Sequence, residues 1–306
     1  MTGRVVEIAE EARHLARFRG FLVVSDGDDE LGRVPLDDID AIVVTARGAS
    51  YSNALVAECA RRGIPLVVCG ENFAPLAWLW PIEGHHTPNL RLRQQLDAGR
   101  ALKKALWKQI VQAKIRQQAA VLDAVGEDAA PLRDFPRKVR AGDPDNIEAQ
   151  AARRYWPLMM GPDFRRDTGG GGVNGMLNYG YAVLRSTVAR AVLANGLHPT
   201  AAIFHSNRGN AFALVDDLME PFRPFVDVVA RKLSDSGVSE VTRDAKAALA
   251  RILLMDMETD AGVTPLKTAA LRAARSLADC YAGEATGLSL PPPQSPLFLS
   301  GGQDHG

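Results

Sequence analysis

The spacing of the hydrophobic residues changes near residue 90, and this change limits what the chain can fold into. Before it, short apolar runs rich in β-branched or aromatic residues are separated by Gly, Asp or Asn, at residues 5–8, 21–24, 41–45, 65–69 and 74–80. Between them, residues 52–62 have helical spacing and precede Gly63, a good helix stop. The first part of the chain is therefore predicted to be a small β-rich domain.

From Leu90 onward the apolar residues recur with a helical period. Residues 90–124 predict one long amphipathic helix or two in sequence, because they contain no proline and only one glycine, Gly99. Further helices are predicted at about residues 145–160, 174–195, 209–232, 239–258 and 263–283. The pattern predicts the α+β class, with a β domain at residues 1–82, a linker at 83–89, a larger all-α domain at 90–286 and a loose tail at 287–306.

Composition bounds the class of protein further. The chain has 306 residues, 46% of them hydrophobic, which is enough to fill the cores of two domains. Its longest apolar runs, residues 64–69 and 74–80, are far shorter than the roughly 20 residues that span a bilayer. The N-terminus lacks the layout of a signal peptide, and the three cysteines form no CxxC pair. A cytoplasmic protein with no membrane partner, disulfide framework or structural zinc is expected.

The charge is unevenly spread although the formal net charge is zero. Residues 1–87 contain eight Arg, no Lys and 13 Asp or Glu, a formal charge of −5, whereas residues 88–140 contain 12 Lys or Arg and five Asp or Glu, a charge of +7. Basic charge concentrated on helices suits a polyanion such as nucleic acid. A solvated helix face is the plainer alternative.

Three segments contain the candidate functional residues, and the first is residues 145–156. Asp145 as N-cap and Glu148 three residues later form a capping box, with Glu148 also favoured by the helix dipole. A carboxylate that binds a cation is less free to reach back to an amide. The structural and the functional interpretation of Glu148 therefore compete.

The second segment is residues 202–210, in which His205 follows an apolar stretch and precedes a polar, turn-like run that includes Asn207. A single histidine at such a boundary is typical of a hydrogen-bonded core residue, and a metal ligand is the alternative.

The third segment, residues 214–224, favours function most clearly. Asp217 and Glu220 share a helix face and repel each other unless a cation lies nearby. Pro221 and Pro224 lack the N–H groups that would bond the carbonyls of Asp217 and Glu220, so the helix should bend there. Packing alone does not explain this acidic pair together with Arg223 and two prolines.

One histidine with two or three carboxylates suits Mg²⁺ or Mn²⁺ better than zinc. Such an ion screens phosphate charge and stabilises the leaving oxygen when a phosphodiester reacts.

The Gly-rich residues 168–172 are not followed by Gly-Lys-Ser/Thr, so they predict a flexible loop and not a phosphate-binding P-loop. The pair His85-His86 is interpreted as part of an exposed linker.

Taken together, these motifs resemble the CRISPR-associated integrase family, here written Cas-one, and within it the type II branch. The resemblance covers nearly the whole chain and includes RVVEI at residues 4–8, PIEGHH at 81–86, LWKQI at 106–110, NYGYAVLR at 178–185, HSN at 205–207 and DDLMEPFRP at 216–224.

The resemblance implies one divalent metal, Mg²⁺ or Mn²⁺, held by Glu148, His205 and Glu220 as metal ligands and catalytic residues. Asp217, Asn207 and Arg223 are expected beside the site. It also implies that homodimers, formed through the β domain, flank a small partner, Cas-two, in a heterohexamer. This assembly inserts a captured double-stranded DNA fragment into a CRISPR array through attack by its 3′-hydroxyls. Lys and Arg at residues 91–116 and 137–140 become candidates for holding the DNA backbone.

Two other functions remain open. The chain is alternatively a metal-dependent nuclease that acts mainly by hydrolysis on branched or single-stranded DNA, which would produce cut ends and no joined strands. A non-catalytic DNA-binding scaffold would bind DNA in a salt-sensitive way and make no product.

Overall fold

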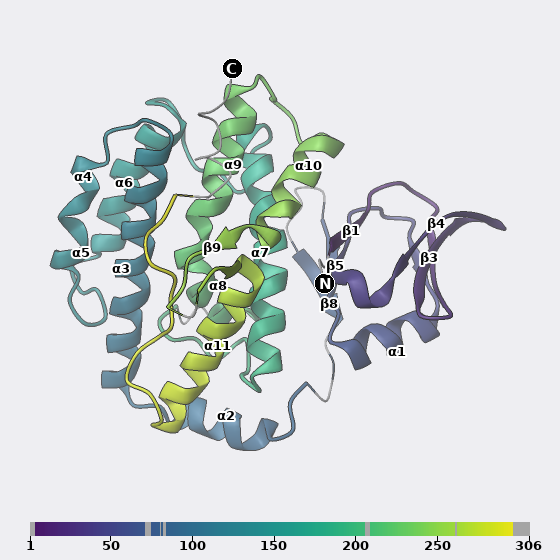
Figure 1. Ribbon diagram of the computed structural model, residues 1–306, viewed down its shortest axis with the longest axis horizontal. Coiled ribbons are helices and arrows are strands. Elements are labelled where there is room, and N and C mark those ends of the chain that lie inside the picture. The colour runs from purple at the N-terminus through teal and green to yellow at the C-terminus, as the bar shows by residue number, and fades with distance from the viewer. Residues whose placement is uncertain are drawn as a thin grey trace.

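The computed structural model describes residues 4–70, 75–79, 81, 84–205, 209–260 and 262–295, which form a β-rich part followed by a larger helical part (Figure 1). This order confirms the predicted α+β class. In the part of the chain that the structure describes, no helix is both long and apolar enough to cross a membrane.

The β-rich part consists of two four-stranded sheets. The first has the order β1-β5-β7-β8, parallel except for the antiparallel β8, with bounds Arg4–Ile8, Ile39–Val44, Leu66–Cys69 and Pro75–Leu79. The second has the order β4-β3-β2-β6, with bounds Asp29–Pro35, Phe21–Asp26, His14–Phe18 and Ser50–Tyr51. Helix α1 (Asn53–Arg62) is capped by the Ser52 side chain and stops at Gly63, which is left-handed as predicted.

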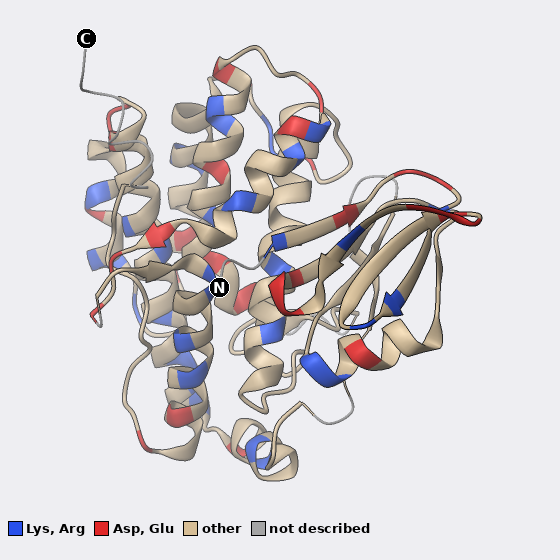
Figure 2. Cartoon of the chain, turned by 45° about the vertical axis from the view of Figure 1, so that its right-hand side comes forward, with Lys and Arg blue, Asp and Glu red and all other residues tan. Residues whose placement is uncertain are grey.

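Strands β2, β4 and β6 are not predicted from the sequence. Strand β4 is mostly exposed and charged, as suits an edge strand, so it lacks the apolar alternation that identifies a half-buried strand. The turn that joins it to β3 contains Asp28 and lies between Asp26 and Asp29, and in Figure 2 it is the red tip at the right. Three of the 13 acidic residues of the first 87 therefore lie at this turn.

The helical part begins with the two consecutive helices that the spacing allows, because the chain breaks at Ala98 and Gly99. Helix α2 starts at Pro88 and not at Leu90, since proline suits the first turn of a helix. The helices are α2 (Pro88–Asp97), α3 (Arg100–Ala124), α4 (Ala130–Arg133), α5 (Phe135–Lys138), α6 (Ile147–Met160), α7 (Val173–Ala194), α8 (Ala213–Met219), α9 (Arg223–Asp235), α10 (Arg243–Ala250) and α11 (Leu266–Ala282). The domain limits at residues 82 and 90 stay a prediction.

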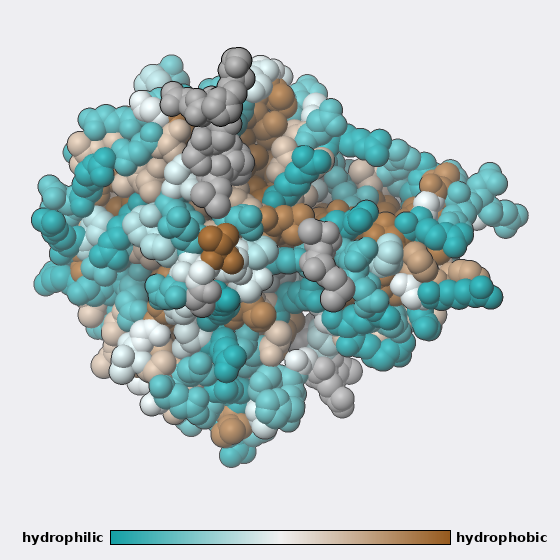
Figure 3. Space-filling model, viewed as in Figure 1, coloured by the Kyte–Doolittle hydropathy of each residue, from teal (hydrophilic) through white to brown (hydrophobic). Residues whose placement is uncertain are grey.

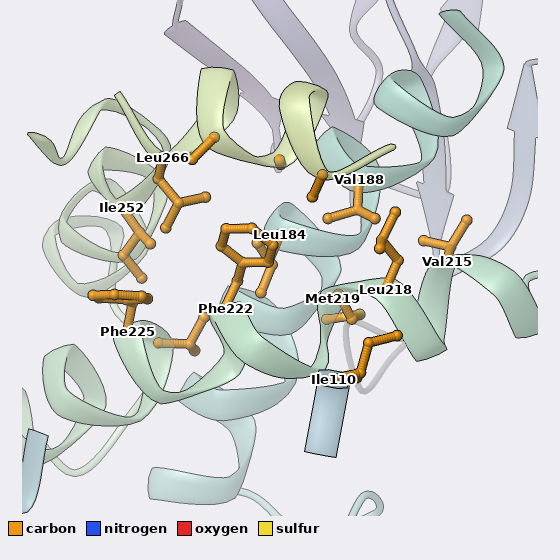
Figure 4. Packing of buried hydrophobic residues seen from close by; sticks show 14 of the residues in the cluster. Ile110, Leu184, Val188, Val215, Leu218, Met219, Phe222, Phe225, Ile252 and Leu266 are labelled. Carbon is orange, nitrogen blue, oxygen red and sulfur yellow. The ribbon is translucent and has the colours of Figure 1, made fainter. Parts of the chain in front are cut away.

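The helix predicted at residues 209–232 bends where its prolines indicate. A short 3-10 turn, η2 (Glu220–Phe222), separates α8 from α9, with Pro221 inside it and Pro224 in the first turn of α9. Figure 4 shows this turn in the middle of the helical core, where Phe222 and Phe225 lie among Leu184, Ile252 and Leu266. The bend is therefore fixed by packing on every side.

One further helix prediction is wrong in its extent. The helix predicted at residues 239–258 is only α10, followed by a 3-10 turn (Arg251–Leu254) and by β9 (Asp256–Met257), which pairs with β10 (Thr264–Pro265). In the tail predicted at residues 287–306, Leu288 donates its N–H to Gln109, and Gln294 bonds with Gln117, both on α3. Residues 296–306 lie outside the described residues, so the loose tail stays a prediction. Local spacing does not reveal the contacts with α3, because they join residues 179 and 177 positions apart.

Ion pairs and ring contacts join the two parts. Glu7 on β1 accepts from Lys246 at 2.6 Å, and Asp40 on β5 accepts from Lys267 at 2.7 Å. Trp78 on β8 stacks on Phe212, just before α8, with ring centroids 4.9 Å apart. On the face shown in Figure 3, hydrophilic residues predominate and hydrophobic residues gather in small separate groups.

A buried polar cluster joins three helices of the core. Asp227 on α9 accepts a hydrogen bond from Tyr155 of α6 at 2.8 Å and another from Tyr181 of α7. Burial raises the pKa of Asp227 to about 6, although both tyrosine hydroxyls favour the ionised form. The cluster fixes α6 and α9 relative to each other two helical turns beyond Glu148 and Glu220.

This pKa predicts how stability depends on pH. The folded protein binds the Asp227 proton more tightly than the unfolded chain, so the contribution of Asp227 to the free energy of unfolding falls as pH rises from about 4 to about 6. Relative to Asp227→Asn, the wild type should lose about 2–3 kcal/mol across this window, measured by urea denaturation. Asp235→Asn, at the end of the same helix, is the control, and an identical pH dependence in Asp227→Asn would contradict the assignment.

Candidate functional site

The structure gathers the three predicted ligands from three separate elements. Glu148 lies in the first turn of α6, His205 follows α7 in irregular chain, and Glu220 begins η2. The ammonium of Lys114, on α3, lies 2.6 Å from Oε1 of Glu148 and 2.5 Å from Oε2 of Glu220. Two carboxylates far apart in the sequence therefore flank one cation.

The start of α6 differs from the predicted capping box. The N-cap is Asn146 and not Asp145, which instead pairs with Arg140. The carboxylate of Asp143 accepts the N–H groups of Ile147 and Glu148 at 2.9 and 3.0 Å, so Glu148 does not serve as the cap. Of the two interpretations of Glu148, the capping box is wrong, since the Glu148 carboxylate contacts Lys114. Its role as a metal ligand stays a prediction.

Asp143 and Asn146 also hold unusual backbone conformations. Their φ angles are 45° and 51°, in the left-handed region that non-glycine residues enter with strain. The hydrogen bonds of the two side chains to the first amides of α6 compensate for this strain. They fix where the helix starts and therefore where Glu148 projects.

Glu220 is almost fully buried, with 8% of its side chain exposed. Burial disfavours its ionised form, but the charges of Arg223 and Lys114 outweigh burial and lower the pKa of Glu220 below its ordinary value. Nε of Arg223 lies 3.0 Å from Oε1. Oε2 has a close cation in Lys114 but no hydrogen bond of acceptable geometry within the described residues. Each of the two carboxylate oxygens of Glu220 therefore has a cation beside it.

His205 is oriented by Asp217, whose side chain is fully buried. Asp217 accepts the N–H groups of Ile203 and Phe204 at 2.8 and 2.7 Å, and its Oδ1 lies 2.6 Å from Nδ1 of His205. An ionised Asp217 requires the proton on Nδ1, which leaves Nε2 as the outward nitrogen. The hydrogen bond to Asp217 raises the pKa of His205, and the charges of Glu148 and Glu220 add to the rise.

Aromatic packing completes the support of His205. The indole of the buried Trp107 stacks on Phe204 with centroids 4.6 Å apart and meets His205 edge-on at 4.9 Å. Trp107 and Lys114 are both on α3, seven residues apart, so they share one helix face. Helix α3 therefore supports the histidine and supplies the cation between the glutamates.

Sequence reasoning missed Asp143 and Trp107, and it counted Lys114 among the candidates for holding the DNA backbone, whereas Lys114 pairs with the two glutamates. The heptad spacing of Trp107 and Lys114 is a signal, but on a helix with many Lys, Arg and Gln residues it does not single them out. Of the residues expected beside the site, Asp217 contacts His205 and Arg223 contacts Glu220. Asn207 lies outside the described residues.

The donor set fits a divalent cation. It offers two carboxylates and the outward nitrogen of an imidazole, oxygen-rich as Mg²⁺ and Mn²⁺ prefer. Among the residues that the structure describes, no three His, Cys, Asp or Glu side chains form a complete cage, and the ammonium of Lys114 separates the two glutamates. Glu148, Glu220 and His205 are the side chains that can hold the ion.

The fold and site together define an α+β protein with a β-rich part, a helical part and an acidic, histidine-containing centre in the helical part. The sequence profile of the family described as "CRISPR associated protein Cas1" matches residues 6–258. The chain therefore belongs to the Cas1 family, which is the family that its motifs predict.

Individual relatives agree with this assignment. The chain is 36% identical over 257 residues to the CRISPR-associated endonuclease Cas1 of Neisseria meningitidis serogroup C (strain 8013), which covers 83% of this chain and 84% of the relative. It is 31% identical over 239 residues to a CRISPR-associated endonuclease Cas1 of Pyrobaculum aerophilum, covering 71% and 78%. The similarity to the Neisseria protein is consistent with the predicted type II branch.

Solved structures share the fold. A casposase bound to an integration product has a TM-score of 0.80 at 17% identity, covering 99% of this chain and 96% of that one. A Cas1 protein from Thermotoga maritima has a TM-score of 0.75 at 14% identity, covering 92% and 97%.

The contact between Asp217 and His205 predicts a measurable pKa change. Asp217→Asn removes the charged acceptor, so the pKa of His205 should fall. Histidine resonances, assigned with His205→Ala, can be followed by NMR as pH changes. Asp216→Asn is the control, because Asp216 pairs with Arg185 at 2.7 Å and not with His205. An unchanged pKa in Asp217→Asn would show that another group orients the imidazole.

Proposed function

We propose that this chain is a divalent-metal-dependent DNA endonuclease and integrase that inserts foreign DNA fragments as new spacers into a CRISPR array. The observation that carries this proposal is the pair of carboxylates, Glu148 and Glu220, on either side of one ammonium. The Asp217-oriented His205 lies close enough for the charges of both glutamates to raise its pKa. Its family membership and the names of its relatives, which are endonucleases, support a reaction at DNA phosphodiesters. The casposase with the same fold is bound to an integration product, which supports strand transfer.

Glu148, Glu220 and Nε2 of His205 would hold Mg²⁺ or Mn²⁺. The ion would supply positive charge where a phosphodiester reacts and lower the pKa of the attacking hydroxyl. Asp217 keeps the Nδ1 proton in place, so the histidine presents Nε2 and does not rotate. Arg223 holds the Glu220 carboxylate from the opposite oxygen. The site needs no nucleophilic side chain, because a 3′-hydroxyl of the fragment can attack directly.

The proposed assembly follows the family. Two structures with this fold are described as complexes of Cas6-RT-Cas1 with Cas2, and another as Cas1 with DNA. For this chain we infer a homodimer formed through the β domain, a Cas2 partner in a heterohexamer, and double-stranded DNA as the fragment and as the repeat. Light scattering of the purified chain tests the dimer.

Hydrolysis without joining is the second candidate, because the relatives are named endonucleases. It would act on branched or single-stranded DNA. Analysis of the products separates the two reactions, since only an integrase produces strands of increased length.

Removing any one ligand should abolish the reaction. We expect Glu148→Gln, Glu220→Gln or His205→Ala to lower metal-dependent joining by at least about a thousandfold, because each change removes transition-state stabilisation worth several kcal/mol. The measurement is the joining of a short duplex into a plasmid that contains the repeat, with Mn²⁺ or with a chelator. Full activity in His205→Ala, or in the chelator, would refute the metal site.

Lys114 provides an independent test that does not require activity. Lys114→Met leaves Glu148 and Glu220 without the shared cation and should cost about 3–5 kcal/mol of stability in a chelator. Because Mn²⁺ would then replace the lost charge, its addition should raise the melting temperature more in Lys114→Met than in the wild type. Lys108→Met on the same helix is the control. Equal shifts in all three proteins would mean that the ion binds elsewhere.

A further inference from the structure

A second polar pocket lies beside the candidate metal site. It is an open pocket with a volume of about 330 Å³, lined by residues of β8, α7 and α8, by Arg223 and by the segment before α7. Its charged lining residues are three arginines and one carboxylate, a formal charge of +2, and these are Arg166, Arg185, Arg223 and Asp216. This arginine pocket shares Arg223 with the metal site, where Arg223 contacts Glu220.

Arg166 is a half-buried cation whose hydrogen bonds go only to neutral oxygens. Its guanidinium donates to the carbonyl of Asp167 at 2.8 Å and to the side-chain oxygens of Asn174 and Asn178 at 2.9 and 2.6 Å. Burial lowers its pKa, while the charges of Asp227 and Asp167 act in the opposite direction. Within the described residues it forms no direct ion pair. A partly desolvated cation that no carboxylate contacts directly can still accept an anion as a hydrogen-bond partner.

The other two arginines leave part of their donor capacity unused. Arg185 pairs with Asp216 through one terminal nitrogen, while its buried Nε has no hydrogen-bond partner among the described residues. The guanidiniums of Arg166 and Arg223 both lie over the Tyr181 ring, 5.5 and 5.0 Å from its centroid. The planar fork of a guanidinium matches the two free oxygens of a phosphodiester.

We propose that the arginine pocket binds a phosphodiester of the DNA strand, next to the phosphodiester that reacts at the metal site. This rests on the proposed function for the identity of the anion. Arg223 is common to both sites, whereas Arg166 and Arg185 line the pocket without contacting Glu148 or Glu220. The pocket therefore suits the phosphate next to the reacting phosphodiester. By binding that phosphate, it would keep the reacting phosphodiester positioned at the metal site.

The test measures binding of DNA oligonucleotides, each with one phosphate replaced by a neutral methylphosphonate, in a chelator. In the wild type, one replacement close to the reacting phosphate should weaken binding about tenfold. Arg166→Gln and Arg185→Gln should each weaken binding of unmodified DNA. In these variants the methylphosphonate at that position should cause no further loss of affinity (no positional effect), because the contact between arginine and phosphate is already absent. With duplex DNA, the slope of log affinity against log salt should become shallower by about 0.9 in Arg166→Gln.

Arg165→Gln is the matched control, because the exposed Arg165 donates only to the carbonyls of Pro162 and Phe164. It should retain both the positional effect and the salt slope. If Arg166→Gln and Arg185→Gln lower affinity but keep the positional effect, the arginines only support the fold and the proposal is overturned. Protection by inorganic phosphate against thermal unfolding, lost in Arg166→Gln and without any positional effect on DNA, would assign the pocket to a free anion and also overturn it.

These outcomes are distinguishable from failure of the proposed function. A positional effect that Arg166→Gln removes, in a protein that makes no metal-dependent product, would support the pocket and refute the enzyme. Product formation with a positional effect that persists in both variants would refute the pocket alone. A wild type that does not bind DNA would refute both.

Discussion

The buried turn Glu220–Phe222 is the constraint on which the rest of the helical part depends. It places a carboxylate, a proline and an aromatic ring in three successive positions at the centre of the core. Phe222 is packed on every side, so the turn has little freedom, and Glu220 is held at the same place. A buried carboxylate is tolerated there because Lys114 and Arg223 neutralise it. The same short turn is thus part of the hydrophobic core and of the candidate metal site.

The same arrangement explains why the site consists of supported side chains. Glu148 is fixed by the strained turn before α6, and His205 by a fully buried aspartate. The link between Tyr155 and Asp227 joins α6 to α9 two turns beyond the two glutamates. Each candidate metal ligand is therefore held in position by neighbouring residues that are not themselves candidate ligands. Such preorganisation is what phosphodiester chemistry demands of a protein.

The distribution of charge follows the division into two parts. The acidic turn between β3 and β4 lies at the far end of the β-rich part, away from the helices (Figure 2). Most basic residues at 88–140 are on α2 to α5, and Arg140 follows α5. Ion pairs already engage Lys114, Arg133 and Arg140. Positive charge is also concentrated in the arginine pocket, where residues 166, 185 and 223 come together. The positive electrostatic potential of the helical part would thus attract a DNA strand.

The sequence by itself determined the two-part α+β organisation, the bend at Pro221 and the family, because these depend on local spacing, proline chemistry and contiguous motifs. It did not reveal β4, whose exposed residues lack alternation, or the pairing of β9 with β10. Only the tertiary structure decided that Glu148 faces Lys114, since that choice depends on α3 crossing α6 and on Asp143 capping the helix. The arginine pocket likewise exists only because α7 and α9 pack together, and no sequence pattern links residues 166, 185 and 223.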